Sequence, residues 1–172
     1  QYAAGRLSKE DVQRLRFEQT LAALDVRGLE SDRLNTVYLT CYARHWTLPE
    51  EARRAYHTLA DHFPVGLLTN GFSEVQRAKF ERFPELEERA AAVVISEEVG
   101  YMKPHRRIFE HAAELAGVPP AALLYVGDSY SSDVRGALDA GWQMAWYAPP
   151  QDAEVPVFRF TAWDRLVDWL LD

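Results

Sequence analysis

The sequence has little of what marks secreted, membrane-spanning or disulfide-stabilised proteins. It contains a single cysteine, Cys41, which has no partner for an internal disulfide, and its first residues show neither the charged nor the apolar region of a signal peptide. No apolar run approaches the roughly 20 residues needed to cross a bilayer. We therefore expect a protein of the reducing cytoplasm with no membrane partner.

A block of positive charge is also missing. The formal net charge is −7, and Lys and Arg residues are scattered in short groups such as Arg53-Arg54. Nucleic acid and anionic lipid are therefore poor candidates as partners. What is present is an ordinary globular composition, with 48% hydrophobic and 26% charged residues. The length suits one domain, or one domain with a small insert, and a hydrophobic core is expected.

The first third of the chain is predicted to be helical. Apolar residues recur at helical spacing within residues 8–25, and Ser8 with Asp11 resembles a capping box that starts this helix. Two further helical stretches are expected, at residues 31–46 and 49–62. Cys41 falls on the apolar side of the first of these two stretches, so we expect it to be buried.

After residue 63 short apolar runs alternate with helical segments. The apolar runs occupy residues 64–71, 91–96, 122–129 and 143–149. Helical segments are expected at residues 73–83, 105–116, 132–140 and 161–171. Strands alternating with helices predict an α/β fold with a doubly wound parallel sheet and right-handed crossovers. A break near residue 47 separates a helical module, residues 1–46, from this α/β module, residues 47–172.

Polar residues follow the first three predicted strands, with Lys103 in the segment after the second. In open α/β sheets ligands bind outside the carboxyl ends of the strands. The first strand ends in Thr69-Asn70-Gly71, whose hydroxyl, amide and flexible glycine are able to bind an oxyanion, although a simple polar turn has the same composition. Lys103 precedes Pro104 and the helix that we expect Pro104 to open. A lysine beside a helix amino end suits an anion, but a solvated surface lysine is the commoner case.

Two aspartates follow the third strand, in the stretch Gly127-Asp128-Ser129-Tyr130-Ser131-Ser132-Asp133. Asp128 leaves the strand and Asp133 lies in the first turn of the next helix, so both carboxylates are able to face one small volume and bind Mg²⁺. The alternative is helix capping, with Ser131 or Ser132 as the N-cap and Asp133 favoured by the helix dipole. Taken together, an oxyanion cradle, a cation and a metal site at one sheet edge favour phosphoryl chemistry.

These residues resemble a known family. The order Thr69-Asn70-Gly71, Lys103-Pro104 and Gly127-Asp128-Ser129 with Asp133 is similar to the second, third and fourth motifs of the haloacid dehalogenase-like hydrolase superfamily. Residues 100–142 resemble that family almost throughout. Residues 1–46 look like the helical cap of its phosphoglycolate phosphatase and nucleotidase type, which implies a Rossmann-like core at residues 47–172.

The resemblance implies a role for each residue. Thr69 and Asn70, with Gly71, would bind the transferring phosphoryl group, and Lys103 would neutralise that group and the nucleophile. Asp128 would ligate Mg²⁺ and Asp133 would support the metal shell. The implied activity is that of a Mg²⁺-dependent phosphatase, which hydrolyses a small phosphorylated metabolite through an aspartyl-phosphate.

One family motif is missing. The family nucleophile is the first aspartate of an Asp-x-Asp motif at the end of the first strand, and no aspartate here is followed two positions later by another. We expect that strand, which lies mid-sheet in the family, to belong to a segment upstream of residue 1, and we expect residues 1–172 alone to be inactive.

Two other activities remain open from the sequence. One is a metal-independent 2-haloacid dehalogenase, although such members typically lack the acidic pair seen here at Asp128 and Asp133 and often carry serine where this chain has Thr69. The other is a catalytically inactive domain that binds a phosphorylated ligand or a protein. Sugar phosphates, phosphoglycolate and nucleoside monophosphates all remain open as substrates, and the oligomeric state is undetermined.

Overall fold

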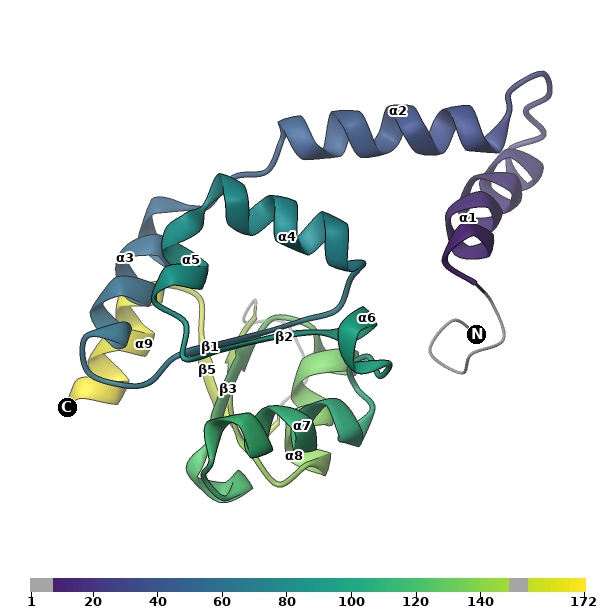
Figure 1. Cartoon of the computed structure of the whole chain (residues 1–172). Coiled ribbons are helices and arrows are strands. Elements are labelled where there is room, and N and C mark those ends of the chain that lie inside the picture. Colours follow the sequence, from purple (N-terminus) through teal and green to yellow (C-terminus); the bar gives the residue numbers. More distant parts are fainter. Residues whose placement is uncertain (1–7, 149–154) are drawn as a thin grey trace. The chain divides into compact units, whose positions relative to one another are not determined.

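The computed structural model describes residues 8–148 and 155–172, which form two compact units (Figure 1). The units divide between Thr47 and Leu48, one residue after the boundary expected from the sequence. Within the described residues no helix is long and apolar enough to cross a membrane. Each unit is described by itself below.

The first unit is a pair of helices, α1 (Lys9–Ala23) and α2 (Ser31–Arg44), which pack against each other. The predicted capping box is confirmed, because Asp11 N donates to Ser8 Oγ and Ser8 N donates to the Asp11 carboxylate, each at 3.1 Å. Neither helix buries a residue. The expectation that Cys41 is buried is therefore wrong, since two helices alone leave its side of α2 exposed.

The second unit alternates strands and helices in the order that the sequence predicts. Its elements are α3 (Glu50–Ala60), β1 (Gly66–Thr69), α4 (Ser73–Arg82), α5 (Pro84–Glu88), β2 (Ala92–Ile95), α6 (Ser96–Val99), α7 (Arg106–Ala116), β3 (Leu124–Gly127), α8 (Arg135–Asp139), β4 (Gln143–Tyr147), β5 (Phe158–Phe160) and α9 (Trp163–Leu171). Three of them, α5, α6 and β5, were not predicted. Each has only three to five residues, too few to show a periodic pattern.

All strand pairs in the described part of the chain are parallel, which confirms the predicted class of α/β fold. The strands form two ladders, with the orders β1-β2 and β3-β4-β5. Thr69, the last residue of β1, lies opposite Ile95, and Gly127, the last residue of β3, lies opposite Trp146. Among the described residues β1 and β3 are not paired with each other, so the expected single sheet is interrupted between them.

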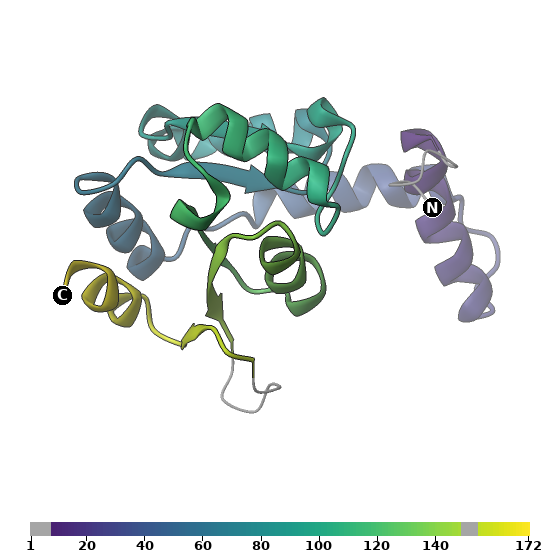
Figure 2. The ribbon, with the colours of Figure 1, turned by 90° about the horizontal axis from the view of Figure 1, so that it is seen from below.

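Helices cover both faces of the β3-β4-β5 ladder (Figures 1 and 2). Successive strand side chains point to opposite faces. Met144 and Trp146 of β4 pack in one core cluster with residues of α7 and α8, whereas Ala145 packs in a second cluster with Leu59 of α3 and Leu166 of α9. This is the doubly wound arrangement that the strand and helix order predicts.

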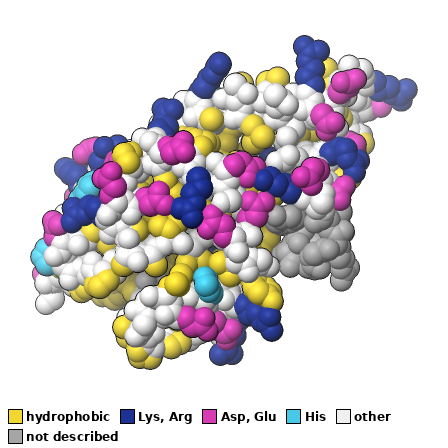
Figure 3. Space-filling view, viewed as in Figure 1, with side chains coloured by type: hydrophobic (Ala, Val, Ile, Leu, Met, Phe, Trp, Pro, Cys, Tyr) yellow, Lys and Arg dark blue, Asp and Glu magenta, His cyan; other side chains and the backbone are white. Residues whose placement is uncertain are grey.

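The surface carries charges of both signs. On the face seen in Figure 3, Lys and Arg side chains are interspersed with Asp and Glu side chains. Ion pairs such as Arg77 with Glu87 and Glu98 join these residues on the surface. Exposed pairs of this kind contribute little to stability individually.

Candidate active site

Loops from three parts of the second unit meet at the carboxyl ends of β1 and β3. The first is the turn after β1, which contains Asn70, and the second carries Lys103 after α6. The third is the turn after β3, which contains Asp128 and Asp133. The Asn70 side chain forms hydrogen bonds with the backbone of Lys103, and the Lys103 ammonium forms an ion pair with the Asp133 carboxylate. That carboxylate accepts a hydrogen bond from the backbone N–H of Asp128. The structure therefore brings together these four predicted residues.

Lys103 is the cation of this cluster and is largely buried. Its Nζ lies 2.8 Å from Asp133 Oδ1 and donates to Tyr125 Oη at 2.7 Å. The side chains of Lys103 and Asp133 are only 11% and 5% exposed to solvent. Burial by itself would lower the pKa of the Lys103 ammonium, but attraction to Tyr125 and the bond to the Asp133 carboxylate raise the pKa above its ordinary value. Lys103 is therefore charged at neutral pH.

The Asp133 carboxylate organises the turn after β3. Its Oδ2 accepts from the backbone N–H groups of Asp128 at 3.2 Å and Ser129 at 2.9 Å, and its Oδ1 faces Lys103. The carboxylate lies so close to Gly127 that a Cβ atom at position 127 would be 2.7 Å from both Cβ and Oδ2 of Asp133. Glycine at the end of β3 is therefore required by close approach, as in other sites where a side chain packs on the backbone.

The helix after this turn begins earlier than expected. Ser129 is the N-cap residue, and its Oγ accepts from Ser132 N at 3.4 Å. The alternative interpretation, with Ser131 or Ser132 as the N-cap, is therefore wrong. A π-helical turn, Tyr130–Val134, precedes α8. It places Asp133 back over the strand end, where its carboxylate caps the turn instead of facing solvent.

Asp128 differs from Asp133 in its surroundings. Its backbone is fixed, because its carbonyl oxygen accepts from Trp146 Nε1 at 3.0 Å and its N–H donates to Asp133. The residue is exposed at the strand end. Within residues 8–148 and 155–172 no group of three or more His, Cys, Asp or Glu side chains is placed to hold a metal ion. Asp128 therefore offers one exposed carboxylate, and a complete Mg²⁺ octahedron would need further oxygen ligands from substrate, water or other residues.

Asn70 clamps the backbone of Lys103. Its Nδ2 donates to Lys103 O at 3.0 Å, and Lys103 N donates to its Oδ1 at 2.8 Å. Both the donor and the acceptor of the Asn70 side-chain amide are thus engaged by the backbone of Lys103. The role of Asn70 in phosphoryl binding stays a prediction, while the structure shows it positioning the loop that presents Lys103.

Substitution of Asn70 tests this clamp. We expect Asn70→Ala to lower the free energy of unfolding by about 1–3 kcal/mol, because the backbone N–H and C=O of Lys103 lose their partners. Asn70→Asp keeps an oxygen that accepts from Lys103 N but turns a carboxylate oxygen toward Lys103 O, so it should also lose stability through repulsion between these two oxygens. Urea denaturation of the three proteins measures both losses. Equal stability of Asn70→Ala and the wild type would contradict the clamp.

Gly71 and Thr69 complete the turn after β1. Gly71 N donates to Ser96 Oγ at 3.0 Å, so this N–H has a protein partner in the structure. Thr69 is the last residue of β1 and is half-buried. Both were predicted to bind phosphoryl oxygens, and both lie at the sheet edge beside Asn70. Their roles stay predictions.

The sequence pattern does not indicate a role for Ser96 or Tyr125. Ser96 begins α6, which is too short to predict from periodicity, and it holds Gly71. Tyr125 lies within residues 122–129, which are predicted to form an apolar strand. A buried tyrosine normally finds a hydrogen-bond partner for its hydroxyl, and that is the signal that marks Tyr125. The prediction that Pro104 opens the next helix is also wrong, since α7 starts at Arg106 with His105 as its N-cap.

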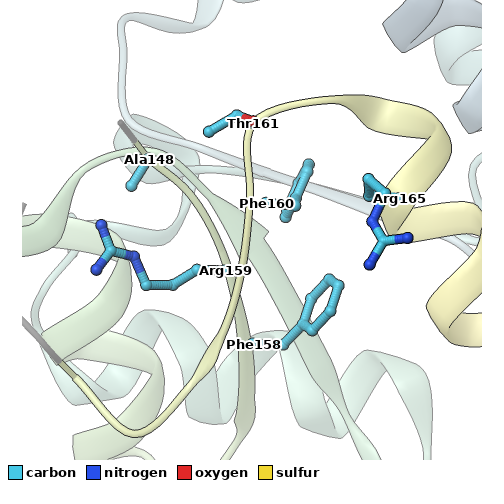
Figure 4. A pocket seen from close by; sticks show the side chains of 6 residues that line it. All are labelled: Ala148, Phe158, Arg159, Phe160, Thr161 and Arg165. Atoms are coloured by element: carbon cyan, nitrogen blue, oxygen red, sulfur yellow. The ribbon is translucent and has the colours of Figure 1, made fainter. Parts of the chain in front are cut away.

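A separate hollow of about 260 Å³ lies beside β5 (Figure 4). Arg159 and Arg165 lie on opposite sides of the strand there. The lining residues are Ala148, Phe158, Arg159, Phe160, Thr161 and Arg165. None of the six predicted site residues is among them, so this hollow is not the candidate active site.

Comparison with known proteins identifies the family of this site. A model of the haloacid dehalogenase-like hydrolases matches residues 3–141. The chain belongs to this family. Its sequence is 34% identical over 146 residues to the pyrimidine 5'-nucleotidase YjjG of Escherichia coli, an alignment that covers 84% of this chain and 63% of the nucleotidase. The chain spans 48% to 63% of the length of this and two other curated relatives.

Solved structures of this hydrolase family share the fold. The hydrolase YfnB of Bacillus subtilis, solved bound to magnesium, matches with a TM-score of 0.76 and 24% identity, covering 97% of this chain and 75% of that one. The L-2-haloacid dehalogenase of Xanthobacter autotrophicus matches with a TM-score of 0.77 and 22% identity, covering 99% and 79%. At these identities the likeness concerns the fold alone. It confirms the predicted Rossmann-like core with a cap.

Proposed function

We propose that the intact protein is a Mg²⁺-dependent phosphatase that acts on a small phosphorylated metabolite. The observation that carries this proposal is the cluster at the strand ends, in which a buried charged lysine pairs with Asp133 and the Asp133 carboxylate accepts from the backbone N–H of Asp128. Phosphoryl transfer needs little covalent chemistry from the protein beyond a nucleophile, and depends on positioning and on charge neutralisation. The membership in the hydrolase family and the likeness to a nucleotidase support the same activity.

Each residue has a defined task in this proposal. The Thr69 hydroxyl donates to a phosphoryl oxygen, and the Lys103 ammonium offsets the charge of the phosphoryl group. Asp128 would hold Mg²⁺, and Asp133 keeps both Lys103 and the backbone of Asp128 in place. Mg²⁺, when bound, supplies further positive charge to the phosphoryl oxygens and orients them.

The nucleophile is proposed to be an aspartate outside residues 1–172. It attacks phosphorus in line, and the leaving alkoxide takes a proton from the second aspartate of the Asp-x-Asp motif. Water, which gives a proton to that same aspartate, then hydrolyses the aspartyl-phosphate. The interruption between β1 and β3 supports this proposal. A parallel strand in that position would pair with both open edges and would end beside Lys103 and Asp128.

Substitution of Asp128 tests the metal role. In the full-length natural protein we expect hydrolysis of p-nitrophenyl phosphate to require Mg²⁺, and Asp128→Asn to lower kcat by roughly 10²-fold or more because charge stabilisation is lost. Asp139→Asn, on the exposed side of α8, is the matched control and should change kcat less than twofold. Activity that is indifferent to both Mg²⁺ and Asp128→Asn would contradict the mechanism.

The same assay separates the alternatives. Halide release from a 2-haloacid without Mg²⁺ would favour the dehalogenase, and ligand binding without turnover of either substrate would favour the inactive domain. Residues 1–172 alone should show no turnover. A substrate panel should include nucleoside 5'-monophosphates, because the named relative is a nucleotidase, together with sugar phosphates and phosphoglycolate.

A further inference from the structure

Trp146 of β4 connects the neighbouring strand to the turn that carries Asp128. It lies opposite Gly127, the last residue of β3, and is only 2% exposed. Its indole Nε1 donates to the backbone carbonyl oxygen of Asp128 at 3.0 Å. A buried indole N–H normally finds a hydrogen-bond partner. Here that partner is the backbone of the residue that is proposed to hold Mg²⁺.

Neighbours from two other parts of the chain hold the indole ring of Trp146. The ring of Tyr130, from the turn after β3, lies 5.5 Å from it between centroids. Arg159 of β5 is directly opposite Trp146 in the β4-β5 ladder, and its guanidinium carbon lies 4.9 Å from the ring centroid. A guanidinium is attracted to the face of a tryptophan ring. The direction of the Trp146 N–H is therefore determined by packing.

The Asp128 backbone is held on both sides of its Cα atom. Its N–H donates to Asp133 Oδ2 at 3.2 Å, and its carbonyl oxygen accepts from Trp146. With both flanking peptide groups held, the Cα–Cβ bond has a fixed direction, and only the side-chain torsions of Asp128 stay free. The bond to Trp146 lies on the side of β3 that pairs with β4. A further strand at the open edge of β3 would therefore leave it in place.

We propose that Trp146 is a positioning residue for Asp128, which sets the direction of the carboxylate and thereby strengthens Mg²⁺ binding without touching the metal or the substrate. The proposal rests on the proposed phosphatase function, in which Asp128 holds Mg²⁺. Loss of a group that orients a metal ligand lowers metal affinity or activity by about 10-fold to 100-fold. Trp146 would act in this way through the backbone of the ligand.

Trp142 provides a matched control in the same core. It directly precedes β4, is 9% exposed and belongs to the same core cluster as Trp146. Its Nε1 is also buried, but has no hydrogen-bond partner among the described residues. Replacement of either tryptophan by phenylalanine removes the same atoms from one core. Only the replacement of Trp146 also removes a hydrogen bond to the candidate site.

The first arm of the test measures how hydrolysis of p-nitrophenyl phosphate by the full-length natural protein depends on Mg²⁺. Trp146→Phe should raise the Mg²⁺ concentration that gives half the maximal rate by roughly 10-fold or more. Saturating Mg²⁺ should restore kcat to within about threefold of the wild type, because mass action offsets weaker binding. Trp142→Phe should leave the half-saturating concentration within about twofold of the wild type, since lost packing does not by itself change metal affinity.

The second arm does not depend on turnover. An ion that binds the folded state stabilises it according to its concentration relative to its dissociation constant. The urea midpoint is measured in MgCl₂ and in NaCl of equal ionic strength, and Asp128→Asn gives the rise that is unrelated to the proposed site. Both tryptophan variants should have lower midpoints in NaCl than the wild type. The rise in MgCl₂ should match the wild type in Trp142→Phe and should be smaller in Trp146→Phe.

The two arms separate the failure of this inference from the failure of the proposed function. Equal half-saturating Mg²⁺ concentrations in the two tryptophan variants, or equal rises of their urea midpoints, would overturn the positioning role and leave the phosphatase in place. A wild-type protein that does not hydrolyse phosphate esters contradicts the proposed function, while a smaller Mg²⁺-induced rise in Trp146→Phe than in Trp142→Phe would still support the positioning role. A wild type whose midpoint rises no more than that of Asp128→Asn would overturn both.

Discussion

Replacement of Lys103 by methionine is expected to cause a large loss of both activity and stability. Methionine keeps the length and much of the packing of the side chain but removes its charge. The Asp133 carboxylate, which is 5% exposed, would then be buried without its cation. Removing one partner of a buried ion pair costs about 3–5 kcal/mol. In the proposed mechanism the Lys103 charge offsets that of the phosphoryl group, so its loss should lower kcat roughly 10²-fold to 10³-fold. Urea denaturation and p-nitrophenyl phosphate hydrolysis by the full-length natural protein measure the two effects.

Two further variants show whether the buried charge is the cause. Arg54→Met, on α3, removes an exposed positive charge and should change the free energy of unfolding by less than about 0.5 kcal/mol. Adding Asp133→Asn to Lys103→Met removes the uncompensated charge, so the double variant should be more stable than the sum of the single losses predicts. Full stability of Lys103→Met would mean that the pair is solvated in solution and that our description of its burial is wrong.

Replacement of Gly127 by alanine is expected to displace the Asp133 side chain and thereby to disrupt the candidate site. The added Cβ would lie 2.7 Å from Cβ and Oδ2 of Asp133, a distance at which one of the two groups has to move. Overpacking of this kind costs about 1–3 kcal/mol. Because Asp133 also holds Lys103, its displacement should lower kcat as well. The free energy of unfolding and kcat of the full-length natural protein are the measurements.

A glycine on another strand provides the comparison. At Gly66, the first residue of β1, an added Cβ would be 3.3 Å from Ala92 O, a contact that small adjustments relieve. Gly66→Ala should therefore lose less stability than Gly127→Ala and should keep its activity. The same loss in both variants would show that strand glycines matter generally, and that the approach of Asp133 to Gly127 has no special effect.

Local features of the fold were accessible from the sequence. The capping box of Ser8 and Asp11 joins residues only three positions apart, so its pattern lies within one helical turn. Long helices such as α7 repeat their pattern often enough to be recognised, and strands such as β4 stand out as continuous apolar runs. β5, with only three residues, does not. The burial of Cys41 was predicted incorrectly because the pattern of a helix shows its apolar side but not whether anything covers that side.

The residue types of the candidate site were also accessible, because each follows a recognisable strand or precedes a helix. The predicted parallel order placed the ends of β1 and β3 at one edge of the core. It did not reveal that Asn70 would bond to the backbone of Lys103, or that Tyr125 would contribute to the site. Those bonds join residues 33 and 22 positions apart, and no local pattern encodes them.

By itself the sequence determined the family, the parallel α/β architecture and the residues gathered at the strand ends, because these depend on residue order and on short periodic patterns. The tertiary structure decided which groups meet. Asp133 turns back over Gly127 through a π-helical turn, and the Tyr125 hydroxyl joins Leu68, 57 residues away, to the ammonium of Lys103. Such contacts depend on how separate strands and loops pack in three dimensions, and a side chain's direction within that packing is fixed only when its neighbours are in place.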